Sequence, residues 1–320
     1  MESPVHLFFM GKGGVGKSTS AALTAIFLAR RGHRILLASL DPAHNQSDIL
    51  ERNLSNKPSR ILPGLRAMEI DREIWIRAYL KEMHVQIRKT YSYLTAFNLE
   101  KYFGVIRHSP GLEEYALALA FEKIRTDRSR FDYLIFDMPP TALSLKFFHL
   151  PSLSLAWIEQ LRALRGEIIE KRELIAKIKL LGREFERDKV LGKIEEQRGR
   201  YQALKTIFED AARTRLILVL NPDKLSRAES LRIVKTLGDI DIAPFCAICN
   251  KRPANGPVAD PEPISDIPVH SLPHSDTPLV GIENLRRFAE RNADVLEQTI
   301  TRNAEPSPPR NRAGTKPAAD

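Results

Sequence analysis

The stretch MGKGGVGKSTS, residues 10–20, decides the fold, because it fits the phosphate-loop pattern G-x-x-x-x-G-K-[ST] between two recognisable elements. The apolar run VHLFFM (residues 5–10) before it predicts a buried strand. The segment 17–31 after it predicts a helix that stops at Gly32. Glycines in such a loop let backbone N–H groups wrap a phosphate, and the helix N-terminus adds its dipole. The residues expected to contact a nucleotide are Gly11, Lys12, Gly13, Gly14, Val15, Gly16, Lys17, Ser18 and Thr19.

The loop holds two lysines, although a phosphate loop needs only one. Lys17 occupies the position that reaches the β- and γ-phosphates of a nucleotide, and the Ser18 hydroxyl occupies the position that binds Mg²⁺. Lys12 lies inside the turn, where most such loops accept any residue. Nucleotide binding alone leaves this second lysine without a role.

Further apolar runs alternate with helical stretches, which is typical of a mostly parallel sheet covered on both faces. We therefore predict an α/β fold, a doubly wound P-loop NTPase. Residues 1–300 form its single domain, and the proline-rich tail 301–320 is predicted to be disordered. Two stretches without strands, about 73–127 (with a break at 108–111) and 155–213, predict a helical subdomain, the second as an antiparallel hairpin. The expected strands after the first are 33–41, 65–71, 131–137, 215–221, 244–250 and 267–272.

Three carboxylates follow strands at the edge where the phosphate loop lies. Asp137 ends the run LIFD and is expected to hold the magnesium shell together with Ser18. Asp41 lies over the nucleotide crevice and is expected to polarise the attacking water; the alternative is an Asx-turn before Pro42. Asp48 is a further candidate contact of the Mg²⁺ shell.

Composition bounds the location and the partners. The chain of 320 residues has 43% hydrophobic and 28% charged residues, ordinary for a globular protein. No apolar run approaches the ~18 residues of a transmembrane helix, and no signal peptide is evident, so a cytoplasmic location is expected. The formal net charge of +9 predicts solvated helix faces and a basic tail or, alternatively, an anionic partner.

The two cysteines, Cys246 and Cys249, have the C-x-x-C spacing of zinc and redox sites. They fall in PFCAICN, which reads as a short buried strand, and residues three apart on a strand face opposite sides. We therefore interpret them as two buried structural thiols.

The motifs together resemble one family. GKGGVGKST is similar to the deviant Walker A loop of the partition, division-site and nitrogenase iron-protein ATPases, and SLDPAHNQSD resembles the first switch of the anion-transporting ATPase family. That family includes the arsenical pump-driving ATPase and the targeting factor for tail-anchored membrane proteins. Further similar segments are SPGLEE (109–114), FDMPPTALSLKFFHLP (136–151), LNPDKLSRAESLRIVKTL (220–237), CNK (249–251) and LPHSDTPLVGIENLRRFA (272–289).

The resemblance implies roles for individual residues. Lys12 matches a signature lysine that crosses a dimer interface to the partner's phosphates, and Asp41 matches the aspartate that activates water. Asn250 matches the asparagine that recognises adenine, with Pro273 packing on the base. It implies ATP and Mg²⁺ as substrate and cofactor, and a nucleotide-sandwiched homodimer.

The chain also departs from the family pattern. Ala142, Leu143 and Ser144 stand where the second switch usually has Gly-His-Thr, which affects the expected switch movement or rate of hydrolysis. The metalloid-binding cysteines have no counterparts, and 155–213 lacks the methionines that suit an adaptable groove for an apolar client.

Two functions from different classes remain open. The first is a Mg²⁺-dependent ATPase whose ATP-gated dimer acts on an unknown protein or membrane-protein partner. The alternative is a nucleotide-switched binding protein with little turnover. Nucleic-acid binding is a weaker variant, because no aromatic-basic motif supports it.

Overall fold

The computed structural model describes residues 3–43, 45–90, 111–126, 130–178, 189–253 and 264–301. The strands are β1 (Val5–Met10), β2 (Ile35–Ser39), β3 (Ser59–Leu62), β4 (Leu65–Glu69), β5 (Tyr133–Asp137), β6 (Thr214–Leu220), β7 (Cys246–Arg252) and β8 (Val269–Pro273). The helices are α1 (Lys17–Arg30), α2 (Asn45–Leu50), α3 (Arg72–Thr90), α5 (Leu112–Thr126), α6 (Thr141–Ile178), α7 (Lys189–Glu209), α8 (Lys224–Gly238), α9 (Ile282–Arg291) and α10 (Ala293–Ile300).

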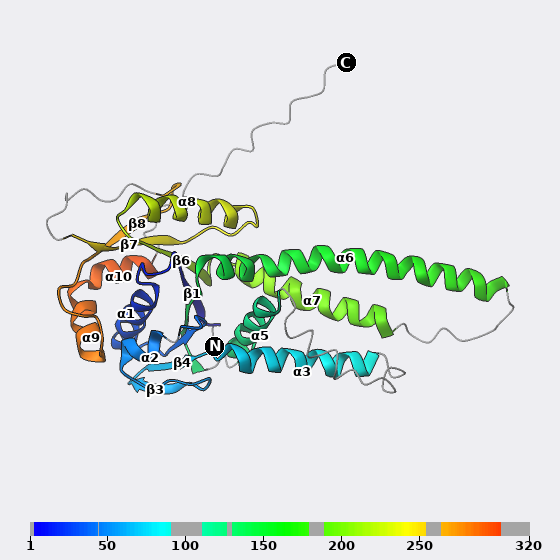
Figure 1. Cartoon of the computed structure of the whole chain (residues 1–320), viewed down its shortest axis with the longest axis horizontal. Coiled ribbons are helices and arrows are strands. Elements are labelled where there is room, and N and C mark those ends of the chain that lie inside the picture. The colour runs from blue at the N-terminus through cyan, green and yellow to red at the C-terminus, as the bar shows by residue number, and fades with distance from the viewer. Residues whose placement is uncertain are drawn as a thin grey trace, which may run out of the picture.

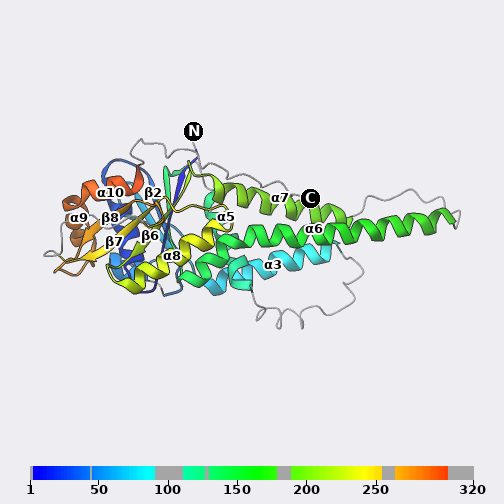
Figure 2. The ribbon, with the colours of Figure 1, turned by 90° about the horizontal axis from the view of Figure 1, so that it is seen from above.

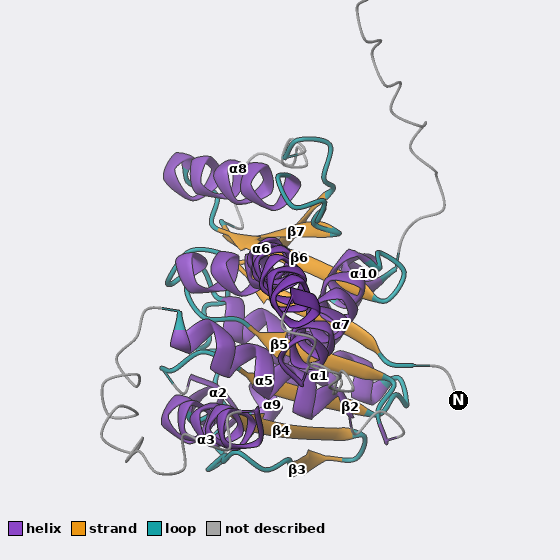
Figure 3. Cartoon of the chain, turned by 90° about the vertical axis from the view of Figure 1, so that its right-hand side faces the viewer, coloured by secondary structure: helices purple, strands orange, loops and turns teal. Residues whose placement is uncertain are grey.

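The strands form one 8-stranded sheet in the order β3-β4-β2-β5-β1-β6-β7-β8. Every neighbouring pair is parallel except β3 and β4, which run antiparallel at one edge. Helices cover both faces of the sheet (Figures 1 and 3). The prediction of a doubly wound, mostly parallel sheet is confirmed, and the continuous apolar strands are explained by burial on both faces.

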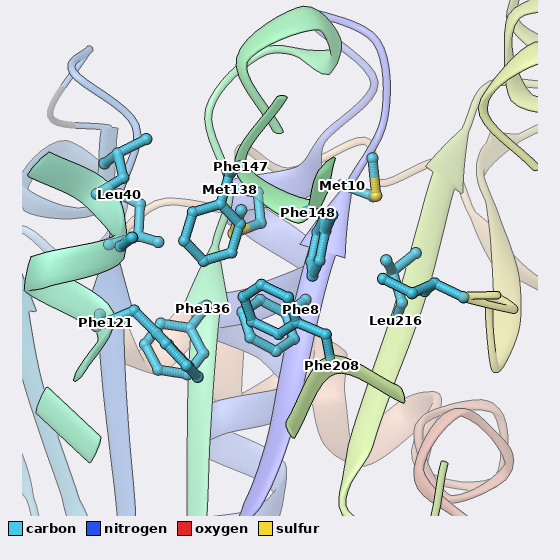
Figure 4. Close-up of a cluster of buried hydrophobic side chains, with 14 of the residues drawn as sticks. Phe8, Met10, Leu40, Phe121, Phe136, Met138, Phe147, Phe148, Phe208 and Leu216 are labelled. Atoms are coloured by element: carbon cyan, nitrogen blue, oxygen red, sulfur yellow. The ribbon is translucent and has the colours of Figure 1, made fainter. Parts of the chain in front are cut away.

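The core has one cluster on each face of the sheet. Helices α1, α9 and α10 contribute to one cluster, and α5, α6, α7 and α8 contribute to the other. The second cluster is rich in phenylalanine (Figure 4). Phe8 of β1 stacks on Phe136 of β5 at 4.9 Å between ring centroids, and both rings are fully buried. Phe147 and Phe148 of α6 and Phe208 of α7 complete this group. These rings hold the first turns of α6 and the end of α7 against the strands that lead into the phosphate loop and Asp137.

Helices α6 and α7 form the expected antiparallel pair, which projects from the sheet domain (Figures 1 and 2). Ion pairs cross between them in antiparallel register, Glu159 with Arg198 and Arg162 with Glu195. The structure begins α6 at Thr141 rather than at residue 155. Pro151 lies inside this helix although proline usually ends one, and its ring is buried where the helix packs on the sheet domain.

The short strand β3 was missed by the sequence analysis. Its side chains are only partly buried, and the Pro63–Gly64 turn returns the chain directly into β4. Such an edge strand carries neither a long apolar run nor a clear alternation. The predicted break at 108–111 and the predicted tail fall almost wholly outside the described residues. Within the described part of the chain, no helix combines the length and the apolar character needed to cross a membrane.

Candidate functional site

The candidate site lies at the carboxyl ends of the parallel strands, around the loop between β1 and α1. Strand β1 lies between β5 and β6, so the chain leaves the centre of the sheet in both directions from this point. In doubly wound sheets, ligands bind at such a switch point, outside the carboxyl ends of the strands. The residues predicted on or after β2, β5 and β7 therefore approach the phosphate loop from both sides of β1.

Two glycines of the loop are required by close approaches of other atoms. A Cβ at Gly11 would lie 2.1 Å from the main-chain oxygen of Val219, and one at Gly16 would lie 2.2 Å from Asn250 Nδ2. Gly11, Gly14 and Gly16 all have positive φ, which favours glycine. The turn is thus fixed by contacts with the ends of β6 and β7.

Polar side chains of β7 and α1 donate hydrogen bonds to the main chain of the loop. Asn250 Nδ2 donates to the main-chain oxygen of Val15 at 2.8 Å, and Lys251 Nζ donates to that of Gly14 at 2.9 Å. Lys17 Nζ donates to the main-chain oxygen of Lys12 at 3.3 Å. Lys251 was not predicted as a site residue, although it follows Asn250 directly in the quoted CNK. It adds a third cation to the loop.

Asp137 is fully buried at the end of β5. Its Oδ2 accepts hydrogen bonds from Gln46 Nε2 at 3.1 Å and from Ser39 Oγ at 3.4 Å, while its Oδ1 has no partner. Burial raises the pKa of Asp137 to about 6, with a further rise from the charge of Asp41, against the lowering effect of hydrogen bonds from Ser18 and Gln46. A buried carboxylate with one unpaired oxygen is suited to a cation.

Gln46 of α2 is a second site residue, after Lys251, that the sequence analysis missed. It is fully buried, and its Nε2 donates both to Asp137 and to the main-chain oxygen of Ser18, the latter at 2.9 Å. Its Oε1 has no partner. Asp48, predicted instead from the same segment, has an exposed side chain on α2. The available signal in the sequence was weak: Gln46 is a polar residue in the segment after Asp41, two positions before Asp48.

These residues fit a magnesium ion. The Ser18 hydroxyl lies close enough to Asp137 to lower the pKa of that carboxyl, and the unpaired oxygens of Asp137 and Gln46 are two further hard donors. Mg²⁺ prefers oxygen ligands and is commonly held by one or two protein groups together with substrate phosphates and water. Consistent with such a sparse set, the described residues include no group of three His, Cys, Asp or Glu side chains that would hold a metal by themselves.

Asp41 lies directly after β2 and is almost fully buried. Its Oδ1 accepts a hydrogen bond from the Ala43 backbone N–H at 3.0 Å, which is the Asx-turn considered from the sequence. The turn fixes the orientation of the Asp41 carboxylate. The negative charge of Asp41 raises the pKa of Asp137. The role of Asp41 toward water stays a prediction.

The Lys12 side chain reaches α8. Its side chain is 46% exposed, and its Nζ lies 3.9 Å from Glu229 Oε2. Glu229 also accepts a hydrogen bond from Thr141 Oγ1 at 3.0 Å, at the start of α6. Through the half-buried carboxylate of Glu229, Lys12 therefore connects the loop to Thr141 in the region that follows Asp137.

The altered second-switch residues lie in the first turn of α6. Ser144 is fully buried, and its Oγ donates to the main-chain oxygen of Pro139 at 2.6 Å. This bond ties the first turn to the segment that directly follows Asp137.

The remaining predicted residues lie on β7 and β8. Asn250 is buried against the loop, whereas Pro273 is exposed at the end of β8. Cys246 and Cys249 are both buried and free, as interpreted from the sequence. Burial raises the pKa of the Cys246 thiol to about 12.

A glycine loop between a central strand and its helix, with a buried aspartate at the end of the adjacent strand, defines a P-loop nucleotide hydrolase. The chain belongs to the anion-transporting ATPase family, whose model matches residues 5–257. It is thus an ATPase of that family.

Relatives in other organisms cover most of the chain. It is 27% identical over 310 residues to the ATPase ASNA1 homolog 1 of Paramecium tetraurelia, which covers 89% of the chain and 91% of that protein. It is 29% identical over 253 residues to the ATPase get3 of Schizosaccharomyces japonicus (77% of the chain, 74% of that protein). It is also 27% identical over 321 residues to the arsenical pump-driving ATPase of Acidiphilium multivorum, of which it covers only 51%, against 93% of the chain itself.

Proposed function

We propose that the protein hydrolyses ATP with Mg²⁺ at this site and that ATP draws two copies together. The observation that carries the hydrolytic part is the group of Ser18, Gln46 and Asp137, in which two buried oxygens lack a partner beside the phosphate loop. Family membership supports the use of ATP.

Each residue has a task that follows from its position. The loop N–H groups and Lys17 bind the phosphates, and Mg²⁺ supplies a positive charge that stabilises the transferring phosphoryl group. Ser18 and Asp137 hold that ion, and Gln46 orients Asp137 through its hydrogen bond. Asp41, oriented by its turn, polarises the attacking water.

The proposed dimer rests on Lys12. Among the described residues, its exposed side chain has an ion-pair contact of 3.9 Å to Glu229, which is weak enough to be exchanged for a phosphate of a second copy. Asn250 and Pro273 are proposed to contact the adenine, since both lie toward the carboxyl ends of neighbouring parallel strands.

The partner is proposed to be a protein, soluble or in a membrane. The names of two relatives refer to an arsenical pump and to get3, and these names describe those proteins. The second candidate, a nucleotide switch with little turnover, is favoured by Ser144, because its buried hydrogen bond restrains a segment that hydrolysis is expected to move.

The substitution Asp41→Asn tests hydrolysis. Asparagine retains an oxygen that accepts from the Ala43 N–H, so it removes the charge while preserving the turn. We expect unchanged ATP affinity and loss of steady-state phosphate release by about a hundredfold or more. Equal turnover in wild type and variant would refute the role of Asp41, and negligible turnover in both would select the switch.

The substitution Lys12→Ala tests the dimer, with Lys224→Ala as the matched control from the exposed end of α8. We expect Lys12→Ala to lose ATP-dependent dimerisation, measured by light scattering, together with phosphate release. The control variant keeps both. A Lys12→Ala protein that dimerises normally with ATP contradicts the proposal.

A further inference from the structure

A second cavity lies at the opposite edge of the sheet, where the parallel strands begin. It has a volume of about 520 Å³ and is bordered by the residues before β2 and β5 and by the β3–β4 turn. Because β2 and β4 are each 5 residues long, the cavity and the nucleotide site are separated by about 17 Å of strand. Cavities of this size commonly bind small molecules.

Four arginines line this cavity, and among the described residues the carboxylate of Asp132 pairs with one of them. The cavity arginines are Arg34, Arg60, Arg66 and Arg130. Asp132 is committed to Arg34, with 2.7 Å between Arg34 Nη2 and Asp132 Oδ1 and a second bond from the Arg34 backbone N–H. The hydrogen bond from Arg34 lowers the pKa of Asp132, so this carboxylate is charged at neutral pH and is paired with Arg34. The positive charge that remains for a ligand is carried by Arg60 and Arg66.

Arg60 and Arg66 form a cross-strand pair of like charge. They lie directly opposite each other in the antiparallel register of β3 and β4, so their side chains leave the same face of the strand pair. Both are exposed, and within the described residues neither forms an ion pair with a carboxylate. Like charges directly opposite each other destabilise a strand pair. A bound anion between them would remove this repulsion.

The backbone around the cavity is fixed. Gly64 has φ +83, and its oxygen accepts a hydrogen bond from Ile35 N at 2.7 Å, which anchors the β3–β4 turn to the start of β2. Leu65 and Phe131 form a buried apolar floor. Arg60 and Arg66 are thus carried by paired strands that do not need to rearrange on binding, which lowers the cost of association.

We propose that this cavity binds a small molecule carrying two or more phosphate groups. The planar guanidinium group matches phosphate oxygens in a bidentate manner, and two opposed arginines match two phosphates. The four arginines of this cavity contribute to the net charge of +9 and lie outside the nucleotide site. The proposal is independent of the function proposed above.

The test uses the full chain carrying Lys17→Ala, which removes phosphate binding at the nucleotide loop. Tripolyphosphate is titrated by calorimetry into this parent protein and into two double variants made in the same background. The cavity variant is Arg60→Ser/Arg66→Ser. The control variant, with an equal change of charge, is Arg213→Ser/Arg232→Ser. Arg213 and Arg232 are exposed and lie outside the cavity. Two charge-assisted contacts of about 1.5 kcal/mol each predict a roughly hundredfold weaker affinity in the cavity variant. The control remains within about threefold of the parent.

Other outcomes overturn the proposal. Equal affinities in the cavity and control variants would show that tripolyphosphate binds elsewhere or only through net charge. Binding of a short single-stranded DNA, lost in the cavity variant while tripolyphosphate binds no variant, would assign the arginines to nucleic acid instead. A second readout guards against misfolding: at low salt without any anion, the cavity variant should be at least as thermally stable as wild type, because the repulsion is gone.

Discussion

Asp137 is fully buried and its Oδ1 has no partner, so we predict that this charged carboxylate destabilises the protein when no cation is bound. Its pKa is raised from 3.8 to about 6, mainly by burial. The folded state therefore binds this proton more tightly than the unfolded state. The stabilising contribution of the protonated form is fully present below about pH 3.8 and is lost as the pH rises through about 6. A shift of roughly two pH units corresponds to about 3 kcal/mol.

The substitution Asp137→Asn removes this charge at nearly constant shape. The asparagine oxygen can take the place of Oδ2 as acceptor for Gln46 Nε2, so the buried hydrogen bond is kept. We expect Asp137→Asn to be more stable than wild type by up to about 3 kcal/mol at pH 7.5 in EDTA, and by less than about 1 kcal/mol at pH 4.

Urea unfolding at a series of pH values measures this difference. The denaturant slope m of the two proteins is compared to check that only the stability has changed. Asp132→Asn is the control of opposite sign, because the pKa of Asp132 is lowered by the hydrogen bond from Arg34. In wild type, the charged Asp132 carboxylate stabilises the folded state above the unfolded pKa, and this contribution is lost as the pH falls through the folded pKa. A wild type more stable than Asp137→Asn at pH 7.5 without metal, or a difference that does not change with pH, would refute the reasoning. Mg²⁺ with nucleotide should stabilise wild type more than the variant.

Three more predictions concern single residues. Gln46→Leu removes the hydrogen bond to Asp137, so we expect equilibrium titrations to show about tenfold weaker Mg²⁺ affinity in the presence of ADP; unchanged affinity would exclude a positioning role. Gly16→Ala places a Cβ 2.2 Å from Asn250 Nδ2 at a positive φ, and denaturant unfolding should show a loss of about 2 kcal/mol or more; wild-type stability would contradict the contact. Cys246, with its pKa raised to about 12, should resist iodoacetamide in the native protein at pH 8 and react after unfolding, as mass spectrometry can follow; rapid native labelling would contradict its burial.

The order of strands and helices could be predicted because it depends on local patterns. Continuous apolar runs such as Val5–Met10 predict strands buried on both faces, and the glycine loop predicts the turn from a strand into a helix. The start of α6 was placed too late: Pro151 lies buried inside this helix, although a proline at such a position usually ends one. The strand β3 was missed because its identity depends on pairing with β4 rather than on its own composition.

The sequence by itself determined the phosphate loop, the parallel sheet and the identity of Asp137, because spacing along the chain fixes which residues a turn and a strand end must contain. Only the tertiary structure decided that Gln46, rather than Asp48, lies against Asp137, because α2 turns one of these side chains inward when it packs on the sheet. It also decided that Arg60 faces Arg66 and that both lie beside Arg34 and Arg130. Charges from separate strands combine into one cavity only when strand pairing and register bring them together.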